Sequence, residues 1–329
     1  GSKSLVRLSY ERLEGFLPPQ RVFITAPATY KDLIAQEVPQ IPEDNYILEP
    51  QKKGTTAANA ISAMIIKQLD PQAVIHFVVA DDYLTDFPRY HQMSLSAFKA
   101  ASQGGVVVFG VKPRYPNPGL GHVKISQKLS QEEGVEIYQA EGFVEKPDEA
   151  TARRYFDSGS YFVHGSGFCS LAKTLLDVLR QDPQNGAIIT QLDKAISAGS
   201  DLSNQPIAEL YSQLVDVPIE YSLLEKAQPL TLITLQDSWN DVGSWQQVYD
   251  IFPKDRQDNV FIGNSQNIIA RESFHNIIFA DKRLIAVTNL RNMVVIDTDD
   301  SVLVCPMADA QHVKKLVEIL EEKKLDQYL

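Results

Sequence analysis

The sequence predicts an α/β protein, a Rossmann-like and mostly parallel sheet with helices on both faces, followed by a small β-helix-like domain that ends in a helix. Over about the first three quarters of the chain, short apolar segments alternate with helical patterns, as in a sheet covered on both sides. After residue 255, apolar pairs recur at nearly constant spacing, as in a β-solenoid. We therefore expect a large α/β domain at residues 1–255 and a small β-domain at residues 256–329.

The first part of the chain contains four strand-like apolar runs that alternate with three helical patterns. In chain order they lie at residues 22–25, 30–37, 46–48, 55–68, 73–79, 90–101 and 106–109. Parallel strands joined by helices bind ligands beyond their carboxyl ends. We therefore expect the functional residues directly after the strands.

The remaining elements follow from the same patterns. Residues 123–168 are rich in strand-like pieces, and helical patterns follow at residues 171–179 and 187–196. The last helix presents one apolar face, which must pack on the β-domain or on a second subunit in a homodimer. That face consists of Val313, Leu316, Val317 and Leu320.

Composition excludes several classes of protein. The formal net charge of -11 argues against a nucleic-acid-binding surface, because such surfaces need clustered Lys and Arg. No apolar run is long enough to cross a bilayer, and the first residues lack the order of a signal peptide, so we expect a cytoplasmic protein without membrane contact. Cys169 and Cys305 form neither a disulfide framework nor a zinc site.

Carboxylates follow two predicted strands. Glu49 comes after one strand, and Asp81 and Asp82 come after another. An aspartate at this edge of a sheet is suited to a divalent cation that bridges phosphates, and the alternative is a turn cap.

A second candidate site lies where two tryptophans flank Asp241. Ser244 precedes a helical run, so Asp241 lies on a tight turn before a helix N-terminus, where unpaired backbone N–H groups favour anions. Taken alone, this turn is either an ordinary helix cap or a site for a phosphate or a metal-bound phosphate.

Three further segments contain candidate residues. Glu145 and Lys146 close a strand before Pro147, which suits the lysine to a phosphate and the glutamate to sugar hydroxyls, or both to an exposed ion pair. Gly121 ends a loop in which glycines allow close approach to a ligand. The segment that contains His164 lacks the spacing of a Gly-x-Ser-x-Gly elbow, which excludes that type of serine hydrolase.

Five motifs occur in the order found in one known family. They are Leu48-Glu49-Pro50 with Lys53-Gly54-Thr55, Val79-Ala80-Asp81-Asp82, Gly110-Val111-Lys112-Pro113 with Gly119-Leu120-Gly121, Val144-Glu145-Lys146-Pro147, and Trp239-Asn240-Asp241-Val242-Gly243-Ser244-Trp245. With the β-domain that follows, they resemble the nucleotidyltransferases that make sugar nucleotides, and among these the bacterial mannose-1-phosphate guanylyltransferases. The resemblance covers essentially the whole chain.

This resemblance implies that an oxygen of mannose 1-phosphate attacks the α-phosphorus of GTP, which forms GDP-mannose and releases pyrophosphate. Asp81 and Asp241 would share a Mg2+ ion, and Lys146 would contact the sugar phosphate as a third catalytic residue. The implied substrate-binding residues are Glu49 at the guanine edge, Glu145 at the sugar hydroxyls, Gly121 at the sugar through its backbone, and Lys53, His164 and Glu220.

The sequence departs from the family pattern in three places. Asp82 stands where the family has histidine, and residues 163–166 correspond only loosely to its Trp-Asn-Ser-Gly turn. A GGxGTR loop and a Pro-Lys pair would precede Ser4 and are missing, so we expect a truncated chain whose triphosphate site lacks its backbone cradle. Two alternatives stay open: an inactive homologue that binds a sugar nucleotide and regulates a partner, and a transferase for another sugar 1-phosphate.

Overall fold

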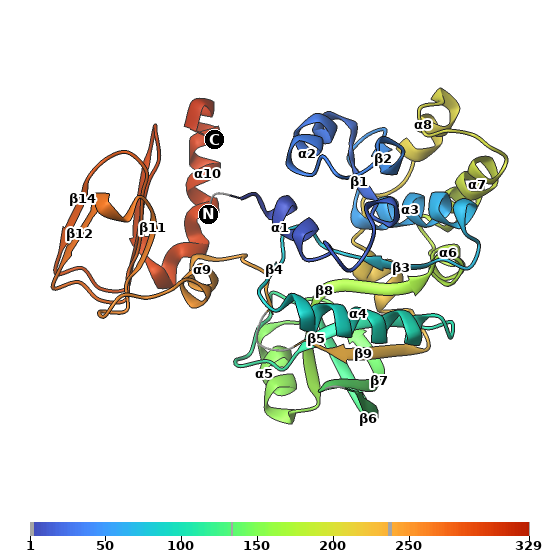
Figure 1. Cartoon of the computed structure of the whole chain (residues 1–329), viewed down its shortest axis with the longest axis horizontal. Coiled ribbons are helices and arrows are strands. Elements are labelled where there is room, and N and C mark those ends of the chain that lie inside the picture. Colours follow the sequence, from blue (N-terminus) through green and yellow to red (C-terminus); the bar gives the residue numbers. More distant parts are fainter. Residues whose placement is uncertain (1–2, 133, 236–238, 329) are drawn as a thin grey trace. The chain divides into compact units, whose positions relative to one another are not determined.

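The computed structural model describes residues 3–132, 134–235 and 239–328 (Figure 1). Its contacts divide the chain into two compact units, with a larger unit at Ser4–Trp239 and a smaller unit at Asn240–Leu329. The change of unit precedes helix α9 (Trp245–Ile251), whose residues pack in the core of the smaller unit. The domain boundary that we predicted after residue 255 stays a prediction.

The larger unit is built around a six-stranded mixed sheet. In spatial order the strands are β3 (Val74–Phe77), β8 (Tyr161–Leu171), β5 (Val106–Val111), β9 (Leu230–Thr234), β7 (Val135–Val144) and β6 (His122–Glu132). A separate two-stranded parallel sheet consists of β1 (Ile24–Pro27) and β2 (Tyr46–Glu49).

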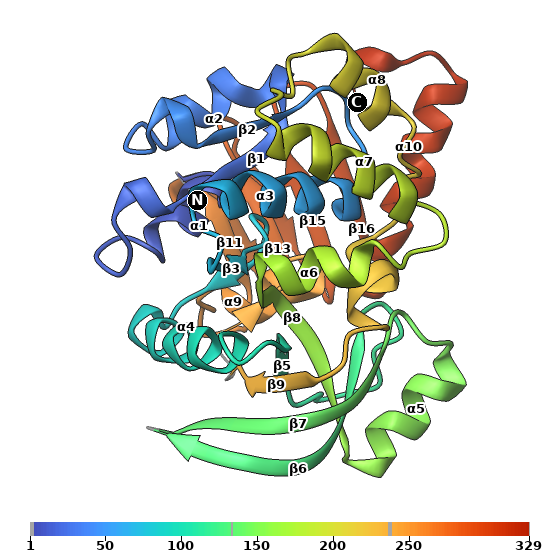
Figure 2. The ribbon, with the colours of Figure 1, turned by 90° about the vertical axis from the view of Figure 1, so that its right-hand side faces the viewer.

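The predicted α/β class is confirmed, but most pairs in the six-stranded sheet are not parallel. Among its described pairs, β5 and β9 run parallel and the others run antiparallel. One reason is the connection between β6 and β7, which is too short for a crossover and therefore joins neighbouring antiparallel strands (Figure 2).

Helices cover both faces of this sheet, as predicted. Alternate residues of β5 enter different cores: Val106 and Val108 pack in one apolar cluster, and Val107 and Phe109 in another. The first cluster includes residues of α3 (Thr55–Leu69), α6 (Ala172–Leu179) and α7 (Gly186–Ser197), and the second includes residues of α4 (Phe87–Ala101). The other elements of this part of the chain are α1 (Leu5–Glu11), α2 (Lys31–Glu37), β4 (Tyr83–Leu84), α5 (Glu149–Ser158), α8 (Gln205–Ser212), the π-helical turn Glu220–Leu224 and β10 (Trp239–Asn240).

The smaller unit is a short β-solenoid, which confirms the predicted β-helix-like domain. Parallel pairing sets Val260 beside Ile277 and Ile277 beside Val294, so one turn of the solenoid spans 17 residues. Each turn carries two strands, which is why apolar pairs recur at about half that distance in the sequence. Its strands are β11 (Val260–Gly263), β12 (Ile268–Arg271), β13 (Ile277–Ala280), β14 (Ile285–Thr288), β15 (Met293–Asp297) and β16 (Val302–Pro306), and the helix α10 (Val313–Glu322) follows.

A buried asparagine connects successive turns of the solenoid. The side-chain amide of Asn276 donates to Asn259 Oδ1 at 2.9 Å and to the carbonyl of Leu290 at 3.0 Å, and its Oδ1 accepts from the Met293 N–H at 3.0 Å. Asn276 has no exposed surface. These bonds satisfy backbone groups that water cannot reach.

We expect Asn276→Ala to lower the free energy of unfolding by about 2 kcal/mol, because it leaves buried donors and acceptors without partners. Denaturant titration measures this change. The control is Asn267→Ala, since the amide of Asn267 donates at an exposed site to the carbonyls of Asp281 and Lys282. A cost for Asn276→Ala no greater than that of the control would contradict a structural role for the bonds between turns.

Within the described residues, no helix combines the length and the apolar character that crossing a bilayer requires.

Candidate functional site

Five predicted site residues lie together in the larger unit: Gly121, Glu145, Lys146, His164 and Glu220, which we call the glutamate cluster. The backbone N–H of His164 donates to the carbonyl of Gly121 at 2.8 Å. Lys146 Nζ lies 3.2 Å from Glu145 Oε1, and the charge of Glu220 acts on both Glu145 and His164. The sheet and the π-helical turn Glu220–Leu224 thus bring together residues that are about a hundred positions apart in the chain.

Gly121 is a position at which a side chain would collide with the cluster. A Cβ atom there would lie 2.5 Å from Cζ of Phe143 and 2.8 Å from Oε2 of Glu145. Phe143 also packs edge-on against the ring of His164, with the ring centroids 5.1 Å apart. Because residue 121 has no side chain, a ligand can approach the backbone beside the Glu145 carboxylate.

Glu145 and Lys146 follow strand β7, and their side chains differ in how far they are exposed to solvent. The strand ends at Val144, and Pro147 cannot continue the ladder. Lys146 adopts a φ of 42°, an uncommon conformation for a residue with a side chain and one that is enriched at functional sites. Its side chain is 61% exposed, whereas that of Glu145 is 8% exposed. The ammonium group is therefore accessible beside a carboxylate that is almost buried.

Burial and neighbouring charge set the electrostatics of this cluster. Burial raises the pKa of Glu145, the charge of Glu220 raises it further, and Lys146 lowers it. Burial also lowers the pKa of His164, so its imidazole is neutral near pH 7. His164 Nε2 carries the proton, since its partner at 3.0 Å is the carbonyl of Gly167. The cluster can therefore accept hydrogen bonds from hydroxyl groups and bind an anion through Lys146.

Asp81 and Asp82 both follow β3, but their side chains have different surroundings. Asp81 is exposed, whereas Asp82 is 6% exposed, and burial raises the pKa of Asp82 to about 6. The Trp239 indole N–H and the Ser166 hydroxyl lie close enough to lower that pKa in part, although neither completes a hydrogen bond of normal geometry with Asp82 Oδ2. Asp81 is therefore the member of the pair that is accessible to a ligand.

The position of Trp239 beside Asp82 was not predicted from the sequence. The indole packs on Gly165, where a Cβ atom would lie 2.5 Å from the ring. Strand β8 therefore needs glycine at position 165. Ser166 next to it has a φ of 66°, and glycines on both sides of this serine were the sequence signal for an unusual backbone.

Glu49 and Lys53 lie against helix α8 and the residues after it. Glu49 is 5% exposed, and its Oε1 accepts from the Tyr211 hydroxyl at 2.5 Å. Lys53 Nζ donates to the carbonyls of Ser212 and Leu214, both at 2.7 Å. Both side chains thus have partners within the larger unit, and their predicted contacts with a substrate stay predictions.

We expect Tyr211→Phe to destabilise the protein more at pH 7.5 than at pH 4.5. Burial raises the pKa of Glu49 above its unfolded value, and the Tyr211 hydroxyl lowers it in part. Without the hydroxyl the folded pKa rises further, so stability falls more steeply as pH rises above about 4.3, the usual pKa of glutamate. The loss in unfolding free energy should be about 2 kcal/mol at pH 7.5.

Urea titration at the two pH values measures this difference, with Tyr221→Phe as the control because Tyr221 is 41% exposed. An equal loss at both pH values would show that the hydroxyl does not stabilise the ionised carboxylate.

The turn that contains Asp241 belongs to the smaller unit. Val242 has a φ of 48°, and its N–H donates to Asn240 Oδ1 at 2.7 Å. Gln247 Nε2 donates to Asp241 Oδ1, and Ser244 caps α9 by accepting from the Gln247 N–H at 3.3 Å. The predicted helix cap is therefore present. It holds the backbone of Gln247, whose side chain donates to the Asp241 carboxylate.

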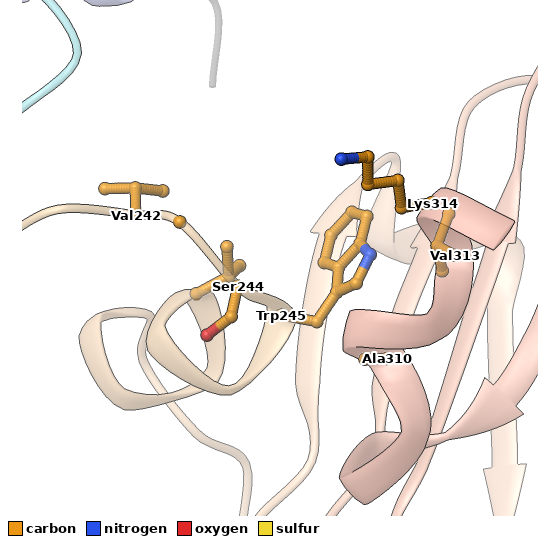
Figure 3. A pocket seen from close by; sticks show the side chains of 8 residues that line it. Val242, Ser244, Trp245, Ala310, Val313 and Lys314 are labelled. Atoms are coloured by element: carbon orange, nitrogen blue, oxygen red, sulfur yellow. The ribbon is translucent and has the colours of Figure 1, made fainter. Parts of the chain in front are cut away.

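A pocket of 390 Å3 within the smaller unit is lined in part by residues of this turn (Figure 3). Figure 3 shows the Trp245 ring next to Ala310, Val313 and Lys314, and these residues line the pocket together with Ser244. Trp245 is also packed against the core of the solenoid. This packing anchors the turn to a rigid element, which keeps Asp241 in a defined position.

Carboxylate side chains among the described residues could bind a divalent cation. The described residues contain no group of three or more His, Cys, Asp or Glu side chains that could hold a metal by themselves. Asp81 in the larger unit is exposed and Asp241 in the smaller unit is half-buried, and each by itself is a carboxylate of the kind that binds Mg2+ together with water and substrate phosphates. Each carboxylate therefore suits a cation that arrives with a phosphate ligand.

Comparisons with known proteins match both units. Residues 19–258 match the family described as nucleotidyl transferase, and residues 266–320 match the family described as MannoseP isomerase/GMP-like beta-helix domain. The mannose-1-phosphate guanylyltransferase of Klebsiella pneumoniae is 29% identical over 100% of this chain and 69% of its own length. The alginate biosynthesis protein AlgA of Pseudomonas aeruginosa is 30% identical over 84% of this chain and 56% of its own length.

Solved structures show the same likeness. The crystal structure described as mannose-1-phosphate geranyltransferase from Thermus thermophilus is 27% identical, with a TM-score of 0.83 over 97% of this chain and 90% of that chain. The structure described as mannose-6-phosphate isomerase from Helicobacter pylori is 21% identical, with a TM-score of 0.58 over 72% of this chain and 91% of that chain. The second likeness concerns the fold alone.

Proposed function

Because this chain belongs to the nucleotidyl transferase family, we propose that it transfers a guanylyl group from GTP to mannose 1-phosphate, which yields GDP-mannose and pyrophosphate. The observation that carries the proposal is the glutamate cluster, where two carboxylates and one exposed ammonium lie at the glycine that opens the backbone to a ligand. Carboxylates suit sugar hydroxyls, and an ammonium suits a phosphate. The likeness of the chain to mannose-1-phosphate guanylyltransferases over its whole length supports the same choice.

In this proposal, positioning and charge neutralisation provide the catalysis. Glu145 and Glu220 accept hydrogen bonds from the mannose hydroxyls. Lys146 holds the phosphate of mannose 1-phosphate so that an oxygen of that phosphate can attack the α-phosphorus of GTP in line with the departing pyrophosphate. Asp81 and Asp241 are each our candidate ligand for a divalent cation, Mg2+ in our proposal, which supplies positive charge to the phosphates when bound. Glu49 and Lys53 remain our candidates for the nucleotide base.

An assay of pyrophosphate release tests the proposal. Purified chain is incubated with each of several nucleoside triphosphates and sugar 1-phosphates, and the pair of GTP and mannose 1-phosphate should give the highest kcat/KM. Glu145→Gln should raise the KM for the sugar phosphate, whereas the control Glu141→Gln should not, because Glu141 lies on β7, the strand that Glu145 follows, and pairs with Lys124 at an exposed position. A preference for UTP would contradict the guanylyl assignment.

The same assay distinguishes a binding protein from an enzyme. If no pair of substrates releases pyrophosphate and calorimetry still shows binding of GDP-mannose, the protein is a sugar-nucleotide-binding protein and the catalytic proposal is wrong. If pyrophosphate release occurs with another sugar 1-phosphate instead, the transferase assignment stands and the mannose assignment is wrong.

A further inference from the structure

Two side chains at helix α1 hold the loop that carries Asp81. This loop connects β3 to β4 and belongs to neither strand. The Ser9 hydroxyl donates to the carbonyl of Ala80 at 2.9 Å. Arg12 Nη2 donates to the carbonyl of Val79 at 2.6 Å. The two carbonyls belong to the residues that directly precede Asp81, so helix α1 fixes the backbone from which the Asp81 carboxylate projects.

The geometry of α1 explains why these two side chains reach the same loop. Arg12 is the C-cap residue of α1 and lies three positions after Ser9, and side chains at this spacing share one face of a helix. Helix α1 packs beside β4, which follows the loop (Figure 1). Both Ser9 and Arg12 are buried. Because water does not compete for buried donors, the two hydrogen bonds hold the loop more firmly than bonds at an exposed site would.

Helix α4 holds Arg12 at both its backbone and its side chain. The Arg12 guanidinium lies over the ring of Tyr90, with Cζ 5.4 Å from the ring centroid, which is the geometry of a cation–π contact. His91 Nε2 donates to the carbonyl of Arg12 at 2.7 Å. Tyr90 and His91 are neighbours on α4. A continuous series of contacts therefore leads from α4 through Arg12 to the residue two positions before Asp81.

Asp82 supplies a negative charge near the buried guanidinium of Arg12. A buried cation is costly without an opposite charge. Burial raises the pKa of Asp82, and the charge of Arg12 is among the effects that lower it, so the two groups lie close enough to interact. Asp82 is buried, whereas Asp81 is exposed. The two aspartates therefore differ in their tasks: one balances the charge of Arg12, and the other stays accessible to a ligand.

We propose that Ser9 and Arg12 are positioning residues for Asp81, and that they hold its carboxylate in the orientation in which it binds a divalent cation. This inference rests on the proposed function, which makes Asp81 a candidate cation ligand. Ser9 and Arg12 do not bind the cation themselves, because each acts through a backbone carbonyl of the loop. Removal of groups that orient a metal ligand typically weakens metal binding about ten- to a hundredfold.

The variants Ser9→Ala and Arg12→Lys test the proposal. Ser9→Ala removes one hydroxyl, and Arg12→Lys keeps the positive charge near Asp82 but loses the planar group that contacts Tyr90 and Val79 together. In the assay of pyrophosphate release, the Mg2+ concentration that gives half of the maximal rate should rise about tenfold in each variant. The KM for mannose 1-phosphate should stay near that of the parent, a separation that a general loss of stability would not produce.

Arg7→Lys and Ser170→Ala are the matched controls. Arg7 lies on the same helix and pairs with Glu11 and Glu14. Ser170 is a buried serine whose hydroxyl also donates to a backbone carbonyl, that of Leu171 at 3.0 Å. These contacts lie outside the loop between β3 and β4, so both controls should keep the Mg2+ dependence of the parent. Urea titration establishes that each variant is folded at the assay temperature.

Binding of Tb3+ provides a second measurement that needs no enzymatic activity. Tb3+ is a hard cation that binds carboxylate oxygens, and under tryptophan excitation it emits only when it is close to an indole. Trp239 lies beside Asp82, and in a Trp245→Phe background it is the only tryptophan, so the emission reports ions near Asp81. The half-saturating Tb3+ concentration should rise about tenfold in Asp81→Asn and in both test variants, and it should not change in the controls.

The two measurements separate this proposal from the proposed function. A parental Mg2+ dependence, or a parental half-saturating Tb3+ concentration, in both Ser9→Ala and Arg12→Lys would overturn the positioning role and leave the proposed function standing. Emission that Asp81→Asn does not weaken would also overturn it, because Asp81 would then hold no cation. If the parent releases no pyrophosphate while Tb3+ binding changes as expected, the proposed function is wrong and the positioning role stands.

Discussion

Gly167→Ala is expected to lower the free energy of unfolding by roughly 4 kcal/mol, the largest loss of stability among the changes considered for this protein. Gly167 has a φ of 78°, a conformation that costs an alanine about 1–2 kcal/mol. An added Cβ would also collide with the carbonyl oxygen of Phe77, which is backbone and cannot rotate away. The collision lies next to the pairing of Phe77 with Phe168, so the end of β3 would have to separate from β8.

Gly159→Ala is the matched control for this change. Gly159 also has a positive φ, of 67°, as the C-cap of α5, but no atom lies within 4 Å of the position that a Cβ would take. It should therefore lose about 1 kcal/mol from backbone strain alone. Thermal and urea unfolding of both variants separate the two contributions. Equal losses for Gly159→Ala and Gly167→Ala would contradict a collision between β8 and β3.

The order of strands and helices could be predicted from the sequence because it depends on local patterns. The helix predicted at residues 55–68 is α3 (Thr55–Leu69), and the strand predicted at 46–48 is β2 (Tyr46–Glu49). Helix α5 was missed although its signals were present: Asp148 caps it by accepting from Thr151, and Gly159 ends it. The helix lies in a region that is otherwise rich in strands, and that context concealed it.

Pairing between strands could not be predicted in the same way, because it depends on contacts between distant residues. Strands β3 and β5 both pair with β8, which follows them in the chain by many residues. Apolar runs look alike in parallel and antiparallel strands when both faces are buried. The solenoid could be predicted because residues of the same type recur in the sequence at its repeat of 17 residues, as Asn259 and Asn276 do.

The candidate site was predicted in part. Motif positions identified the members of the glutamate cluster, and the structure shows that they lie together. The burial of Glu49 against Tyr211 could not be predicted, since the two residues are 162 positions apart and neither has a local signal for the other. For the same reason, the position of Trp239 and Ser166 next to Asp82 became visible only in the structure.

Asp241→Asn is expected to reduce kcat roughly a thousandfold with almost no effect on folding. The substitution replaces one carboxylate oxygen by an amide nitrogen of similar size, which removes the negative charge and, in our proposal, a cation ligand. The remaining oxygen can still accept from Gln247 Nε2, and the cap of Ser244 on Gln247 is unchanged, so the turn should persist. Steady-state rates of pyrophosphate release measure the change in kcat, and urea titration measures stability.

The control for this prediction is Asp250→Asn, because Asp250 is an exposed residue of α9, the helix that follows the Asp241 turn, and accepts from Gln246 Nε2 at 3.1 Å. It removes the same charge at an exposed position away from the turn, and it should leave kcat within about twofold of the parent. If Asp241 acts through a cation, raising the Mg2+ concentration should partly restore the activity of Asp241→Asn, since weaker binding is offset by mass action. Near-normal kcat in Asp241→Asn would show that the carboxylate serves only the helix cap, because the amide preserves the contacts of the turn and removes the negative charge.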